Sequence, residues 1–157
     1  MARITLALLS AVIALTLAAP ARAGLGDPIP APFTKVLYSV PGIINDGVAT
    51  VISCSSALPA SVNVGVEWFQ NDGTSLGVSS FTIPAGGTAN FESNSITSLP
   101  ASAAIPALPQ IKSGAARVLS TTTSGVLCNA FEIDPSNDPP ARMMQLLITG
   151  VKKQKGQ

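Results

Sequence analysis

The stretch SVNVGVEWF, residues 61–69, decides the fold class. Apolar side chains alternate along it with a period of two, which is typical of a β-strand with one buried face. The predicted core face carries Val62, Val64, Val66 and Trp68. Phe69 has the opposite parity, so we predict that its ring faces outward, where an exposed aromatic is a candidate contact for a carbohydrate or a protein partner.

Further β-type runs lie on both sides of this stretch, and turn sequences separate them. Asn-Asp-Gly occurs at 45–47 and at 71–73, and such Asp-Gly pairs favour tight hairpin turns. A third hairpin is predicted through 122–124. The predicted strands fall at 36–44, 47–54, 61–69, 76–84, 88–92, 114–121 and 125–133.

Two segments are less regular. Residues 93–113 contain three prolines and no sustained alternation, which predicts a long surface loop. Residues 141–151 fit a helix face or a strand, and the preceding Pro139-Pro140 with the β-rich context favours a final strand. With about seven to eight strands and no helix, the sequence predicts an all-β antiparallel sandwich, with a barrel as the alternative.

The first 23 residues have the pattern of a signal peptide. Arg3 precedes an apolar run that ends before the cleavage-type triplet Ala21-Arg22-Ala23. A membrane anchor is the alternative, but the run is shorter than the ~20 apolar residues of a spanning helix. We therefore expect a secreted or periplasmic protein that does not span the membrane after signal removal. A Pro-rich extended leader (24–35), a domain (36–151) and a basic tail (152–157) follow.

Composition excludes several classes of function. The chain has 157 residues, which fits one domain, and it contains no histidine, so Ser-His-Asp triads and HExxH zinc sites are impossible. Removal of Arg3 and Arg22 with the signal leaves seven basic against eight acidic residues and turns the net charge from +1 to −1. Such a balance gives no broad attraction to nucleic acid.

The two cysteines, Cys54 and Cys128, both lie in the mature domain. In an oxidising compartment an even count favours one disulfide, although two buried free thiols are the alternative. They are too far apart for a CxxC redox motif and too few for a zinc site. No metal or cofactor is therefore predicted.

The order Cys54, Trp68, Cys128 resembles the Cys…Trp…Cys layout of immunoglobulin-like sandwiches, and FTIPAGGTANF (81–91) is similar to a strand-turn-strand edge of bacterial members. The whole resembles small secreted bacterial β-sandwich proteins. The resemblance implies an inter-sheet disulfide packed on Trp68. Val126 stands where that family has a tyrosine two residues before the second cysteine, so strand order is not carried over.

Candidate catalytic and metal motifs have simpler explanations. Residues 73–77 match G-x-S-x-G, but a nucleophile elbow needs an α/β fold and a histidine, so we predict a hairpin turn. The Asp- and Asn-containing stretch 134–138 is predicted to serve its own turn rather than calcium. The glutamates, which an acid-only hydrolase would need in pairs, are explained by outward strand faces; they are Glu67, Glu92 and Glu132.

The sequence thus predicts a non-catalytic binding, adhesion or structural module of the bacterial envelope or exterior. Recognition would use exposed strand edges and the 93–113 loop, with an envelope polymer or a protein as partner. Candidate surface residues are Tyr38, Phe69, Lys152, Lys153 and Lys155. The alternative is self-assembly by strand addition through the Pro-rich start or the C-terminal strand, and a secreted hydrolase is the third class.

Overall fold

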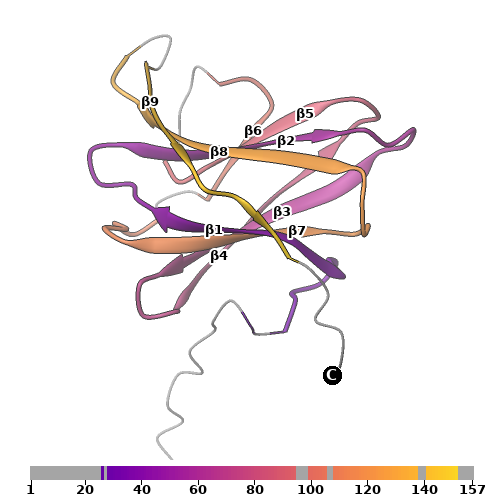
Figure 1. The fold of residues 1–157 in the computed structure, drawn as a ribbon, viewed down its shortest axis with the longest axis horizontal. Helices are drawn as coiled ribbons and strands as arrows, with labels where there is room; N and C mark the ends of the chain where they lie inside the picture. Colours follow the sequence, from indigo (N-terminus) through magenta and orange to yellow (C-terminus); the bar gives the residue numbers. More distant parts are fainter. Residues whose placement is uncertain (1–25, 27, 95–98, 106–107, 138–140, 152–157) are drawn as a thin grey trace, which may run out of the picture.

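The computed structural model describes residues 26, 28–94, 99–105, 108–137 and 141–151. Two five-stranded sheets stack as layers, and no helix occurs in these ranges (Figure 1). Sheet A has the order β10-β1-β7-β3-β4, and sheet B has the order β6-β5-β2-β8-β9. The strands are β1 (Lys35–Ile43), β2 (Ala49–Ser56), β3 (Val62–Gln70), β4 (Ser75–Ile83), β5 (Thr88–Glu92), β6 (Ser102–Ala104), β7 (Gly114–Ser120), β8 (Val126–Asp134), β9 (Ala141–Leu146) and β10 (Thr149–Gly150).

The all-β prediction is confirmed, and every strand pair is antiparallel except β5–β6. The final segment forms strands, as its context favoured. The predicted signal peptide and the basic tail 152–157 lie outside the described residues. None of the described residues forms a helix of the length and apolarity needed to cross a membrane.

The core lies between the two sheets and includes the face predicted from the alternation in β3. Val62, Val64, Val66 and Trp68 are all buried there. The Trp68 indole N–H donates to Ser79 Oγ at 3.2 Å, so the one polar atom of this large side chain has a partner on β4. Sheet B contributes Ile52, Cys54, Ala89, Phe91, Val126 and Ala130 to the same core.

Consecutive strands often change sheets, and this corrects two predicted hairpins. The 71–73 turn does join a hairpin, β3–β4, with Gly73 at φ 85°. The 45–47 turn instead leads from β1 in sheet A to β2 in sheet B, and the 122–124 turn leads from β7 to β8 in the same way. At 45–47 and at 122–124 the chain does reverse direction, but the two strands that each turn connects lie in different sheets.

The predicted disulfide is present and joins Cys54 to Cys128. The two residues face each other on neighbouring strands β2 and β8 of sheet B, so the disulfide does not link the two sheets as the immunoglobulin-like resemblance implied. Trp68 lies in the opposite sheet and shares the core cluster with Cys54. Such a bond is typical of an oxidising compartment.

The 93–113 segment is irregular, as predicted, but two features hold it to the sandwich. The short strand β6 extends sheet B beside β5, and Ile111 is fully buried in the core. Buried Asn45 holds both ends of the segment. Its side-chain amide donates to the carbonyl of Ser93 at the start and to that of Pro109 near the end, and its Oδ1 accepts from Ile111 N–H. The segment is therefore anchored at both ends.

The Pro-rich leader packs on the outer face of sheet A. Phe33 is buried, with its ring over Gly65 of β3. The backbone N–H of Thr34 donates to Ser120 O at 3.0 Å, which fixes the leader against the end of β7. The leader that was predicted to be extended therefore covers part of this sheet face.

Gly65→Val is expected to displace this cover. A Cβ at position 65 would lie 2.5 Å from Cζ of the Phe33 ring, so the ring must move, at a cost of about 1–3 kcal/mol of unfolding free energy. Urea denaturation measures the loss, and hydrogen exchange at Thr34 reports release of the leader. The matched control is Gly150→Val, because Gly150 has no atom within 4 Å of an added Cβ. Equal behaviour of the two variants would contradict the expectation.

Candidate binding site at the open side of the sandwich

The C-terminal strands cross from one sheet to the other on one side of the sandwich. β9 pairs with β8 in sheet B, and the last pair of that ladder is Ala130 with Leu146. β10 then pairs with β1 in sheet A, and Val151 N–H donates to Leu37 O at 2.9 Å (Figure 1). Because the chain leaves sheet B after Leu146, the first residues of β8 have no described strand on their outer side.

The direction of the β8 backbone groups follows from the hydrogen bonds at its start. Gly125 O accepts from Ala57 N–H beside β2, whereas Val126 O accepts from the Tyr38 hydroxyl on the other side. Adjacent residues of a strand direct their polar groups to opposite sides, so Cys128 shares the direction of Val126. The 4.1 Å separation of the Cys54 and Cys128 Cα atoms agrees with a non-hydrogen-bonded pair. Val126 and Cys128 therefore present backbone groups at an open sheet edge.

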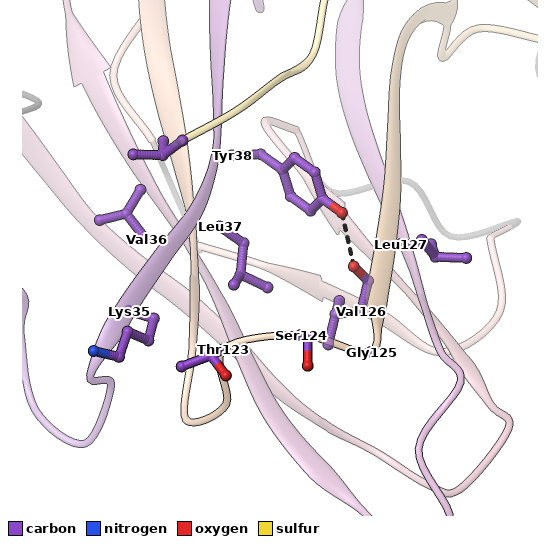
Figure 2. A pocket seen from close by; sticks show the side chains of 10 residues that line it. Lys35, Val36, Leu37, Tyr38, Thr123, Ser124, Gly125, Val126 and Leu127 are labelled. Carbon is purple, nitrogen blue, oxygen red and sulfur yellow. Dashed lines mark hydrogen bonds between the residues drawn. The ribbon is translucent and has the colours of Figure 1, made fainter. Parts of the chain in front are cut away.

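A cavity of about 370 Å³ lies beside this edge, between β1 and the start of β8. Figure 2 shows the Tyr38 ring reaching across it toward Val126, with a distance of 2.8 Å between the hydroxyl and the carbonyl oxygen. Thr123 and Ser124 of the turn add hydroxyl groups. The apolar part of the lining comes from Val36, Leu37, Val126, Leu127 and Val151.

Large apolar side chains are exposed around the same place. Leu127 is 66% exposed and Val151 is 50% exposed, and both line the cavity. Leu147, which follows the last residue of β9, is 70% exposed. An open edge with hydrogen-bonding groups and an adjoining apolar cavity can hold an extended polypeptide, because its backbone pairs with the edge and alternate side chains enter the cavity.

Phe69 does not belong to this site, and its predicted exposure is wrong. It does lie on the outer side of sheet A, but it is 1% exposed. Arg117 covers its ring at 5.4 Å from the centroid and forms a 2.8 Å ion pair with Glu67. Ser75 Oγ donates to the same carboxylate, and Arg117 Nη2 donates to Pro28 O of the leader. Glu67 is therefore buried in a polar network rather than solvated on an outward face.

The other predicted positions contribute little to the open side. Residues 73–77 form the β3–β4 hairpin with a register irregularity, in agreement with the predicted turn. Lys152, Lys153 and Lys155 lie outside the described residues. Glu92 lies on the outer face of sheet B as predicted, beside its register partner Val51, but it is buried there. Glu132 is buried too and has the parity of the core residue Ala130, so its predicted outward face is wrong. No group of three or more His, Cys, Asp or Glu side chains suited to a metal ion occurs among the described residues.

Asp134 illustrates the turn chemistry predicted for 134–138. Its carboxylate accepts from the backbone N–H and hydroxyl of Ser136 and from the side chain of Asn137. The Ser136 hydroxyl and N–H, together with Asn137, lower the pKa of the Asp134 carboxyl below its ordinary value. Its oxygens thus serve the turn itself.

Sequence reasoning placed Tyr38 among the candidate surface aromatics but missed the rest of the cavity. Leu37, Val126 and Leu127 read as ordinary members of β-type runs, and nothing in their order signals that β9 ends early. Comparisons with models of known protein families, with curated proteins and with solved structures found no match to the chain.

Proposed function

We propose that the protein is an exported, non-catalytic binding module that takes up an extended segment of a partner protein at the open edge of β8. The observation that carries the proposal is the departure of β9 after Leu146, which leaves Val126 and Cys128 unpaired by any described strand beside an apolar cavity. Edge strands in most proteins are covered or charged, so an open edge next to apolar side chains is characteristic of interaction sites.

Export and the lack of catalysis are supported by independent features. The N-terminal pattern of a charged, an apolar and a cleavage segment favours export, and the disulfide fits an oxidising compartment. A chain without histidine lacks the usual general base. The immunoglobulin-like relationship is part of this proposal as an architectural likeness, carried by the two-sheet sandwich and its buried Trp68, and the disulfide within one sheet departs from it.

Binding would replace one internal hydrogen bond. A strand laid along β8 donates to the carbonyls of Val126 and Cys128 and accepts from their N–H groups. The Tyr38 hydroxyl already donates to Val126 O, so it competes with the incoming N–H for that oxygen. Every second side chain of the incoming strand faces the Leu37 side of the cavity, which favours peptides with alternating apolar residues.

We expect a displayed library of random peptides to yield binders with alternating apolar residues. Tyr38→Phe should tighten their binding about fivefold, because removal of a competing hydrogen bond is worth about 1 kcal/mol. Leu127→Asp should weaken binding at least about tenfold, because it places a charge beside the apolar cavity. Isothermal titration measures both effects, and NMR shifts of the Val126 and Cys128 amides locate the bound peptide.

The matched control is Met144→Asp, because Met144 is another exposed apolar residue of sheet B, at 52%. It should leave peptide affinity unchanged. Failure to enrich any peptide, or binding that shifts other amides and ignores Leu127→Asp, would refute the proposal.

A further inference from the structure

The opposite edge of sheet A is β4, a long strand that lies near β5 and β6 of sheet B but is paired with neither. β4 is the last strand of its sheet, and no described strand pairs with its outer side. Its nine residues, SLGVSSFTI, contain no charged residue and no proline. Soluble proteins usually place lysine, proline or a covering loop on such an edge to prevent pairing with another chain.

The backbone groups that face outward on β4 can be assigned from its partner β3. Gln70 N–H donates to Thr74 O on the β4 side, whereas Asn63 O accepts from Thr121 N–H on the β7 side. Even-numbered residues of β3 therefore bond to β4. Their register partners are Ser79, Phe81 and Ile83. The residues between them direct their N–H and C=O groups away from the sheet, and these residues are Val78, Ser80 and Thr82.

We propose that β4 pairs with β4 of a second copy of this chain, antiparallel, about a two-fold axis at Ser80. In this register Ser80 faces Ser80 of the second copy, and Val78 faces its Thr82. The three outward residues of each copy then bond to one another, so both edges are satisfied together. The two five-stranded sheets become one continuous sheet across the dimer.

Side chains on the outer face also fit this register. Val78, Ser80 and Thr82 share the face of Asn63, Gly65 and Glu67, because they are register partners on β3. A cavity of about 210 Å³ opens on the same face and is lined by Pro32, Phe33, Asn63, Ser80, Phe81 and Thr82. Val78 of the second copy, opposite Thr82, stands at the mouth of this cavity, and an apolar β-branched side chain beside threonine is a favourable cross-strand pair.

Charge and area set the strength of the contact. Because β4 carries no charge, two copies bring no like charges together at the edge. One strand pair buries much less than the roughly 1,200 Å² of a standard stable interface. We therefore expect a reversible dimer with a Kd of about 10⁻⁵ to 10⁻³ M.

Charge variants at the axis test the register. Ser80 is exposed, so Ser80→Glu and Ser80→Lys leave the fold intact, and each places two like charges opposite each other in a homodimer. Sedimentation velocity over a concentration series should show the Kd of each variant raised at least about tenfold. An equimolar mixture of the two variants should dimerise again, because the facing charges are then opposite.

The matched control is Ser113→Glu, an exposed serine just before β7 and outside the β8 cavity, which should dimerise like the native chain. Three results would each overturn the proposal. These are a native chain that is monomeric up to about 10⁻³ M, dimers that ignore both Ser80 variants, and a mixture that associates no better than either variant alone. Peptide binding at β8 is a separate measurement, so either proposal can fail without the other.

Discussion

Arg117→Ala is expected to lower the free energy of unfolding by about 3–5 kcal/mol, among the largest effects of any single substitution in this chain. The arginine is 1% exposed, and its partner Glu67 is also buried, at 5%. Removing the cation leaves the buried Glu67 carboxylate without its counter-ion, although the Ser75 hydroxyl still donates to it, and it removes the group stacked on Phe69. Equilibrium denaturation in urea measures the loss.

A double variant separates charge from packing. Arg117→Met with Glu67→Leu removes both charges and retains most of the volume, so we expect it to regain most of the stability lost in Arg117→Ala, since apolar replacements of buried ion pairs are often neutral or stabilising. If Arg117→Ala lowers the free energy of unfolding by less than about 1 kcal/mol, water reaches Glu67 and the leader does not exclude solvent from the ion pair.

Removing the disulfide is expected to cost about 4 kcal/mol in the Cys54→Ala, Cys128→Ala variant. The bond closes a chain segment with a sequence separation of 74 residues, and its absence restores that freedom to the unfolded chain. Urea denaturation without reductant compares this double variant with the native protein, so that only the native chain carries the bond.

The valine pair, Cys54→Val with Cys128→Val, is the control for packing. Cys54 is fully buried, and valine fills the space that alanine leaves empty. If the crosslink dominates, the valine pair should be almost as unstable as the alanine pair. Recovery of native stability in the valine pair would assign the loss to the cavity instead.

The alternation in 61–69 was sufficient to predict the strand and its core face, because a period of two depends only on which side of one sheet is buried. It could not predict that Phe69 is covered. That residue does lie on the outer side, but Arg117, which is distant in sequence, covers its ring and is itself bonded to the carbonyl of Pro28 in the leader. The position of a residue along a strand shows which face of the sheet its side chain lies on. Whether that side chain is exposed depends on which other segments pack on that face.

Sheet assignment was beyond the sequence for a similar reason. The Asn-Asp-Gly turns at 45–47 and 71–73 look alike, yet one connects different sheets and the other closes a hairpin. The difference depends on non-local pairing, namely β1 with β7 and β2 with β8. The candidate site could not be predicted from the sequence for the same reason, because it exists only where the pairing of β9 with β8 ends.

The crossing of the C-terminal strands sets the order in which this chain can finish folding. β10 pairs with β1, so the first strand of the sandwich receives its last neighbour from nearly the end of the sequence. A chain that emerges N-terminus first during synthesis therefore leaves the outer side of β1 unpaired until residues 149–150 appear. Contacts between such distant segments form slowly, so we expect the β1–β10 pairing to be the last to form, and a product truncated before Thr149 would lack it.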